Sequence, residues 1–155
     1  MPFKKIDALC IHQLFEVQVE RTPNAIAVIF ENQQLTYRAL NARANQLAYY
    51  LKELGVKPDV LVGLYLERSL DMTVGLLGIL KAGGAYVPLD PANPKERLAF
   101  MLSDTQLPVL LTQKVLMDGL PEHHAHTVCL DLDWGAISQK CDENPISQTT
   151  SDNLA

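Results

Sequence analysis

The chain has 155 residues, of which 48% are hydrophobic, and a formal net charge of -5 at pH 7. This size and apolar content predict one globular domain with a substantial core. With only 13 lysines and arginines and no basic run beyond Lys4-Lys5, the composition argues against a nucleic-acid surface, and its mild acidic excess indicates no particular partner.

The chain has no sequence pattern typical of a membrane protein or a secreted protein. Its longest apolar stretch, residues 72–80, is shorter than the roughly 20 residues that span a bilayer, and Asp7 interrupts any signal-peptide core after Lys4-Lys5. The cysteines are odd in number and far apart, which favours neither a disulfide framework nor a zinc site. They are Cys10, Cys129 and Cys141. We therefore expect a soluble cytoplasmic protein with free thiols.

The first third of the chain predicts two helices separated by a β-hairpin. In chain order these elements span residues 11–21, 25–30, 34–36 and 37–54. Apolar residues recur at helical spacing in the first helix, which Pro23 ends. Asn32-Gln33 turns the hairpin. Thr36 caps the second helix, whose apolar residues form one stripe, and Gly55 ends it.

The middle of the chain predicts a strand, a helix and a second strand joined by a two-glycine turn. An apolar run at 60–66 suits a strand that is buried on both faces. Ser69 then caps a helix in which Gly75 and Gly78 indicate close approach by a neighbouring backbone, as in a helix packed on a sheet. Gly83 fits a C-cap that needs positive φ.

The strand after this turn, residues 85–89, is limited by Pro88, because proline cannot donate to a sheet ladder. Ligands of open α/β sheets lie beyond the carboxyl ends of the strands, so we expect residues 88–91 on the functional rim. Lys81 falls in the last turn of the preceding helix, where its charge suits the helix dipole.

The last third predicts further alternation of helices and strands. Asn93, Pro94 and Glu96 together form a strong helix start, with an asparagine cap and a reciprocal glutamate. Strands follow at 108–112 and 127–130, a short polar segment at 113–119 suits a helix, and the tail from Lys140 is polar. Alternating strands and helices predict an α/β fold with a mostly parallel sheet flanked by helices and right-handed crossovers.

Two stretches resemble a known family. Residues 80–91, L-K-A-G-G-A-Y-V-P-L-D-P, resemble the second core motif of the adenylation domains of non-ribosomal peptide synthetases, and residues 35–40, L-T-Y-R-A-L, resemble the first. The similarity runs from about Ile11 to Thr112 and resumes at 151–155. Ala39 replaces the family's glutamate, so no capping box can form there, and we expect a loss below about 1 kcal/mol.

The resemblance implies part of the large N-terminal subdomain of an adenylate-forming enzyme, with an N-terminal hairpin. It implies a linker at residues 1–10, a partial subdomain at 11–139, and a polar loop at 140–155 that leads to the family's phosphate-binding loop. The chain ends at Ala155, before that loop.

For the parent enzyme, the resemblance implies activation of an amino acid with ATP and Mg²⁺ as an aminoacyl adenylate, with release of pyrophosphate. The acyl group then passes to the phosphopantetheine thiol of a carrier protein. No family residue for this chemistry matches a position here, so we assign no catalytic, cofactor-binding or metal residue and expect the chain alone to be inactive. Expected partners are the remainder of the domain and the carrier and condensation domains, and exposed apolar surface is expected to favour self-association.

Several side chains could serve either a ligand or the structure. Arg68 and Arg97 could bind an anion near the rim, although a surface salt bridge is the favoured explanation. The imidazoles of 123–126 could suggest a metal site, but no further ligand completes it, which favours an exposed loop. Gly83-Gly84 lies at the wrong helix end for phosphate, which favours packing.

The remaining polar candidates fit structural roles more simply. Tyr86 is expected to pack and His12 to lie at the surface or its boundary. The carboxylates of Asp71, Glu96 and Asp104 suit caps and solvated faces, because no pair of them is placed for acid-base chemistry.

Two other functions fit the same pattern of elements. One is a stand-alone α/β interaction module without catalysis. The other is a nucleotide-binding regulator with a flavodoxin-like sheet, which is disfavoured because no phosphate-loop motif occurs.

Overall fold

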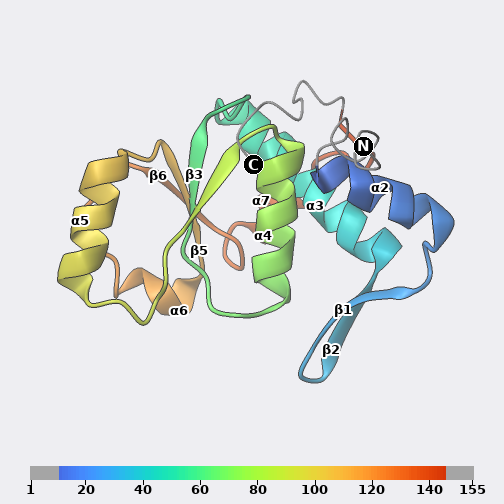
Figure 1. Cartoon of the computed structure of the whole chain (residues 1–155), viewed down its shortest axis with the longest axis horizontal. Helices are drawn as coiled ribbons and strands as arrows, with labels where there is room; N and C mark the ends of the chain where they lie inside the picture. The colour runs from blue at the N-terminus through green and yellow to red at the C-terminus, as the bar shows by residue number, and fades with distance from the viewer. Residues whose placement is uncertain (1–10, 146–155) are drawn as a thin grey trace, which may run out of the picture.

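The computed structural model describes residues 11–145, so the predicted linker at 1–10 and the residues from 146 onward lie outside the described part. The elements in chain order are α2 (Ile11–Arg21), β1 (Ile26–Phe30), β2 (Gln33–Thr36), α3 (Tyr37–Glu53), β3 (Leu61–Leu64), α4 (Leu70–Lys81), β4 (Ala85–Pro88), α5 (Lys95–Thr105), β5 (Val109–Thr112), α6 (Lys114–Met117), β6 (His126–Cys129) and α7 (Trp134–Ile137). Figure 1 shows their arrangement.

The four strands β3 to β6 form a parallel sheet in the order β4-β3-β5-β6. Strands β1 and β2 form a separate antiparallel hairpin that projects beside α2 and α3 (Figure 1). One apolar core joins α3 and α4 to one face of the sheet, and a second joins α5 to the other face. This architecture confirms the predicted α/β class and the N-terminal hairpin.

The predicted N-terminal caps of helices α3 and α4 are present in the structure. The Thr36 hydroxyl accepts a hydrogen bond from the Ala39 backbone N–H at 3.1 Å, and the Ser69 hydroxyl accepts one from Met72 at 3.4 Å. Each cap satisfies a donor that the first helical turn leaves unpaired. A single hydroxyl residue therefore marks where each of these two helices begins.

The two-glycine turn ends α4 as predicted. Gly83 has φ of 92° and donates its N–H to the Leu80 carbonyl, while the Gly84 N–H reaches the Ile79 carbonyl, both at 3.0 Å. These two bonds form a Schellman motif, which satisfies carbonyls at the end of the helix. The chain then enters β4, which pairs with β3 in the described sheet.

The glycines inside α4 allow close packing, although against side chains rather than the backbone that we expected. A Cβ at Gly75 would lie 2.9 Å from Leu64 Cδ1 on the sheet, which agrees with helix-on-sheet packing. A Cβ at Gly78 would lie 2.5 Å from Leu47 Cδ2, so this glycine faces α3. The second approach is between two helices because α4 contacts both the sheet and α3.

Four local predictions were wrong or incomplete. The hairpin turn lies at Glu31-Asn32, because Glu31 takes a positive φ of 54°. Helix α5 has no side-chain cap, because its N-cap residue is Pro94 rather than the predicted Asn93. Helix α7 was not predicted. His12 is buried, with 2% of its surface exposed, because α2 turns it toward the rest of the fold.

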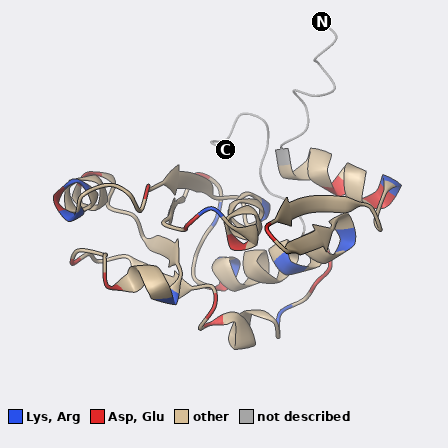
Figure 2. Cartoon of the chain, turned by 90° about the horizontal axis from the view of Figure 1, so that it is seen from below, with Lys and Arg blue, Asp and Glu red and all other residues tan. Residues whose placement is uncertain are grey.

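Charged side chains are dispersed over the described part of the molecule. Figure 2 shows lysine and arginine on several helices and loops, with acidic side chains among them. Within residues 11–145, no helix has both the length and the apolar character that crossing a membrane requires.

Candidate functional site

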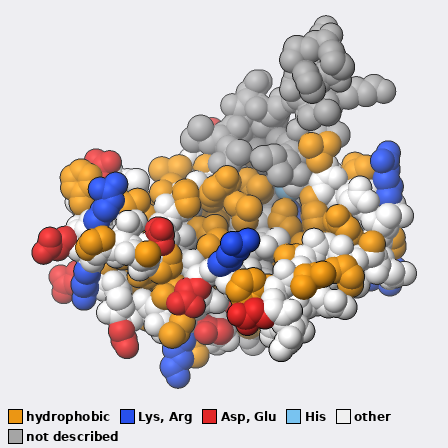
Figure 3. All heavy atoms as spheres, turned by 60° about the horizontal axis from the view of Figure 1, so that its bottom comes forward, with side chains coloured by type: hydrophobic (Ala, Val, Ile, Leu, Met, Phe, Trp, Pro, Cys, Tyr) orange, Lys and Arg blue, Asp and Glu red, His pale blue; other side chains and the backbone are white. Residues whose placement is uncertain are grey.

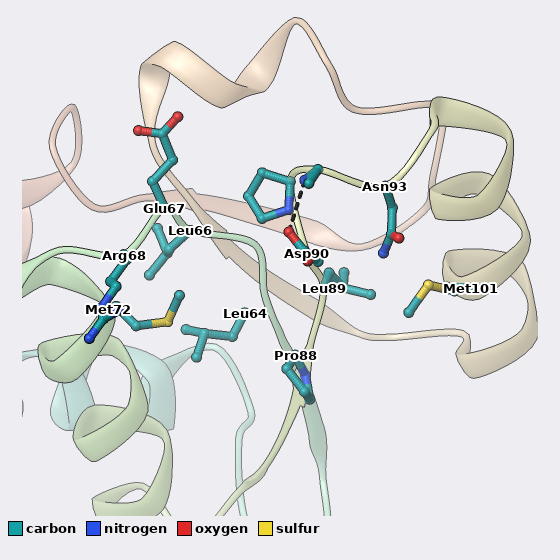
Figure 4. A pocket seen from close by; sticks show the side chains of 12 residues that line it. Leu64, Leu66, Glu67, Arg68, Met72, Pro88, Leu89, Asp90, Asn93 and Met101 are labelled. Atoms are coloured by element: carbon teal, nitrogen blue, oxygen red, sulfur yellow. Dashed lines mark hydrogen bonds between the residues drawn. The ribbon is translucent and has the colours of Figure 1, made fainter.

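A groove lies beyond the carboxyl ends of β3 and β4 (Figure 4). The chain leaves β3 toward α4 on one face of the sheet and leaves β4 toward α5 on the other. In open α/β sheets, such a divergence of neighbouring strands opens a crevice where ligands bind. The groove encloses about 830 Å³, which is in the size range of small-molecule sites.

The groove has an apolar floor and walls from both faces of the sheet. Leu64 and Leu89 are buried at the ends of the two strands. Met72 of α4 and Met101 of α5 lie on opposite sides, as Figure 4 shows. Because methionine side chains adapt to irregular shapes, these walls suit an apolar segment or group more than a rigid polar ligand.

The rim carries the polar groups. Residues 88–91 line it, which confirms their predicted position. The Asp90 carboxylate accepts a hydrogen bond from the Ala92 backbone N–H at 2.9 Å, so it serves as a turn cap. Arg68 also lines the rim and is exposed, and within the described residues it forms no ion pair.

The other arginine candidate is not part of this groove. Arg97 lies exposed on α5, outside the lining, and it forms no ion pair with any residue that the structure describes. Tyr86 is half-buried and packs against the core shared by α3 and α4, as expected. Of the sequence candidates, the structure therefore brings together Arg68 and residues 88–91.

The described residues do not fit a nucleotide triphosphate site. The Gly83 and Gly84 N–H groups are already bonded to carbonyls of α4, so they cannot cradle a phosphate. Helix α4 begins with Asp71 in its first turn, where its carboxylate would repel an anion. Residues 11–145 contain no group of three side chains that could hold a metal ion. We therefore derive no catalytic step from these residues.

The histidine-rich segment is held by local contacts. His123 Nδ1 accepts a hydrogen bond from the Ala125 N–H at 3.1 Å, and its Nε2 lies 3.4 Å from the Thr127 hydroxyl. His124 is exposed in the loop, whereas His126 begins β6 and is exposed there. These contacts agree with a surface role for the segment.

Sequence reasoning missed a buried polar cluster under α2. Lys81 is only 1% exposed and forms an ion pair with Glu16, and its ammonium lies 5.8 Å from the Phe15 ring centroid. Burial lowers the pKa of Lys81, and the hydrogen bond and charge of Glu16 oppose that shift. Burial likewise lowers the pKa of His12. The periodicity contained one signal, because Lys81 continues the face of α4 that carries buried Val74 and Leu77.

The two described cysteines differ in reactivity. Cys129 is buried and donates its thiol hydrogen to Asp131 Oδ1 at 2.8 Å, whereas Cys141 is exposed. Burial, together with the Asp131 carboxylate, raises the pKa of Cys129 to about 11.

We expect iodoacetamide to label Cys141 readily at pH 8 and to spare Cys129, because only about one thiol in a thousand would be ionised when the pKa is about 11. Labelling of Cys129 should rise as the pH approaches that value. Peptide mass spectrometry of the native chain measures both rates, and urea-unfolded chain provides the control. Equal labelling of the two thiols in the native chain at pH 8 would contradict this assignment.

The described fold agrees with comparisons to known proteins. A family model described as AMP-binding enzyme matches residues 15–154. One component of the linear gramicidin synthase of Brevibacillus parabrevis is 52% identical over 145 residues, which cover 94% of this chain and 3% of that protein. Tyrocidine synthase 3 of the same organism is 48% identical over 148 residues, which cover 96% of this chain and 2% of that protein. The chain thus spans a small fraction of these relatives.

Solved structures show the same arrangement of elements. The nonribosomal peptide synthetase FmoA3, in its alpha-methyl-L-serine-AMP bound form, matches with a TM-score of 0.87 and 32% identity, over 94% of this chain and 16% of that chain. The NpsA N-terminal subdomain of Klebsiella oxytoca, in complex with anthranilyl-AMSN, matches with a TM-score of 0.80 over 95% of this chain and 37% of that chain. At 22% identity, the second match supports the fold alone.

Proposed function

Because the chain belongs to the family of AMP-binding enzymes, with residues 15–154 matching its model, we propose that it forms the first part of an amino-acid-activating adenylation domain. The parent reaction joins an amino acid to the AMP portion of ATP and releases pyrophosphate. The aminoacyl group then passes to the phosphopantetheine thiol of a carrier protein. The match to FmoA3, whose structure holds an aminoacyl-AMP, is the observation that carries this proposal.

In this proposal the described residues act as a scaffold. ATP and Mg²⁺ would bind to polypeptide that follows this chain in the parent, because residues 11–145 supply neither a free phosphate cradle nor a group of metal ligands. By itself the 155-residue chain is then inactive. The division into a linker at 1–10, a partial subdomain at 11–139 and a polar connection at 140–155 is part of the same proposal.

The partner proposed for the exposed apolar surface is the remainder of the same domain. The face that Figure 3 brings forward has hydrophobic side chains at the surface between charged ones. Val115 in α6 and Leu132 after β6 are 71% and 57% exposed. Exposed apolar surface of this kind is typical of a contact with another protein segment or domain. Carrier and condensation domains would be further partners. The proposed compartment is the cytoplasm, whose reducing conditions suit the free thiols of Cys129 and Cys141.

A chimera tests this function directly. Residues 11–155 would replace the matching segment in the adenylation domain of the linear gramicidin synthase component that is 52% identical. We expect the chimera to retain amino-acid-dependent exchange of pyrophosphate into ATP, and the isolated chain to show none. The unmodified relative and a chimera with the segment deleted provide the controls.

Two results would contradict the proposal. Exchange by the isolated chain would show that the described residues suffice for the chemistry. A chimera that folds, as measured by its circular dichroism and melting transition, but remains inactive would show that the segment cannot serve as an adenylation scaffold.

A further inference from the structure

The last described residues are held along the polar side of α3. Gln46 Nε2 donates to the Ser138 carbonyl at 3.2 Å, and Lys140 Nζ forms an ion pair with Glu53 at 2.6 Å. The Arg43 guanidinium lies 6.0 Å from the Trp134 ring centroid. Residues 134–140, which end at the first residue of the predicted polar loop (140–155), therefore follow α3 closely.

Asn144 is an exposed residue of this segment whose side chain accepts three hydrogen bonds from the helices. Its Oδ1 accepts hydrogen bonds from Asn41 Nδ2 at 2.9 Å, from Asn45 Nδ2 at 3.1 Å and from Lys81 Nζ at 3.4 Å. Pro145, which follows, is buried. We call the four residues Asn41, Asn45, Lys81 and Asn144 the Asn144 clasp.

Asn45 is a buried polar residue whose amide needs hydrogen-bond partners. It is fully buried on a face of α3 that otherwise carries leucine and alanine, and a buried amide without a partner costs free energy. Its Nδ2 donates to the Asp142 carbonyl at 2.7 Å as well as to Asn144. The amide nitrogen of Asn45 is therefore matched to the segment that covers it, whereas its Oδ1 is buried without a hydrogen-bond partner among the described residues.

Lys81 connects the clasp to α2 and α4. Its ammonium carries the ion pair with Glu16 and also reaches Asn144, while its side chain has no exposed surface. Charged donors form stronger hydrogen bonds than neutral ones. Three helices, α2, α3 and α4, thus meet at this cluster, in which Asn45 and Lys81 are buried and Asn144 is exposed.

We propose that Asn144 is a positioning residue that fixes the point from which the chain continues past Pro145, through its bonds to Asn41, Asn45 and Lys81. The clasp stands on the contacts of this chain. Its consequence for the reaction, correct placement of the polypeptide that follows, rests on the proposed function.

A matched pair of variants tests the clasp in the full chain. Asn144→Leu removes the acceptor at similar size, whereas Asn144→Asp retains an acceptor oxygen. Because all three bonds end on Oδ1, we expect Asn144→Leu to speed hydrogen exchange in residues 139–145 about 10-fold, and Asn144→Asp to leave it close to the wild-type rate. Mass spectrometry of a peptide from this segment measures both.

Exchange in β5 (Val109–Thr112), a fully buried strand, reports global unfolding. It should speed by no more than the factor measured in residues 139–145 for Asn144→Leu, and it should stay near the wild-type rate for Asn144→Asp. Asn45→Leu provides a second route, since it keeps an apolar helix face but removes two bonds, and it should also speed exchange in residues 139–145. Unchanged exchange in Asn144→Leu, or equal acceleration in Asn144→Leu and Asn144→Asp, would contradict the proposal that bonds to Asn144 Oδ1 position this segment.

The same pair placed in the gramicidin synthase chimera tests the consequence for the reaction. Asn144→Leu should lower the maximal rate of pyrophosphate exchange at least about 10-fold, and Asn144→Asp should preserve most of it. If the clasp loosens in the isolated chain but the active chimera keeps its full rate, Asn144 does not position the parent's reaction. If the unsubstituted chimera is inactive, the proposed function fails while the exchange result for the clasp still holds.

Discussion

Replacing Glu16 with leucine is expected to destabilise the chain by about 2–3 kcal/mol, because it leaves the ammonium of Lys81 buried without its carboxylate. Losing one partner of a fully buried pair typically costs slightly more. Glu16 retains 19% exposure, and Lys81 can release its proton, so we place the effect at the lower end. Urea unfolding followed by circular dichroism measures this difference.

The double variant Glu16→Leu/Lys81→Met separates charge from packing. Because two apolar side chains of similar volume can replace a buried ion pair at little cost, it should recover most of the lost stability. A double variant as unstable as Glu16→Leu would mean that the packing of α2, rather than the unpaired ammonium, carries the effect.

The pH dependence of the single variant has a defined sign. Burial already lowers the pKa of Lys81, and removing Glu16 removes the groups that oppose this shift. The folded state then binds fewer protons than the unfolded state in the window between the lowered pKa and the ordinary one. Stability of Glu16→Leu should therefore rise as the pH increases through that window. A flat profile would contradict a buried, charged Lys81.

Replacing Gly78 with alanine is expected to destabilise the chain by about 1–3 kcal/mol, in spite of alanine's higher helix propensity. The new Cβ would lie 2.5 Å from Leu47 Cδ2 and 2.8 Å from its Cγ. Leu47 is fully buried, so it cannot move aside without disturbing the contact between α3 and α4. Thermal and urea unfolding measure the change.

Gly135 offers the matched control for this prediction. It lies in α7, where a Cβ added to it would have nothing within 4 Å, so Gly135→Ala should be neutral or slightly stabilising. A second variant, Gly78→Ala/Leu47→Ala, should couple strongly, because the smaller side chain makes room for the new methyl group. Additive effects of the two substitutions would contradict direct contact.

The sequence predicted helix ends correctly at positions where the residue type favours one structural role. Thr36 and Ser69 marked helix starts through their caps, and Gly83 marked the end of α4 through its positive φ of 92°. The strand after it followed from Pro88 and its apolar neighbours. Such features depend on a few adjacent residues, so they can be predicted without knowing the fold.

Only some of the residues that line the groove could be predicted from the sequence. Residues 88–91 were expected at the carboxyl end of their strand, and they line the groove. Their companions Met72 and Met101 come from helices on opposite faces of the sheet. Pairing them required the strand order, which no local pattern contains.

The α/β class, the hairpin, the caps of α3 and α4 and the two-glycine turn follow from the order of residues, because each depends on backbone preference and on the spacing of apolar residues over a few turns. The assembled fold was needed to show that Lys81 is buried against Glu16, that Asn144 accepts bonds from α3 and α4, and that Gly78 faces Leu47. Those contacts join residues that are far apart along the chain, so their energies depend on packing between helices that no short window of sequence describes.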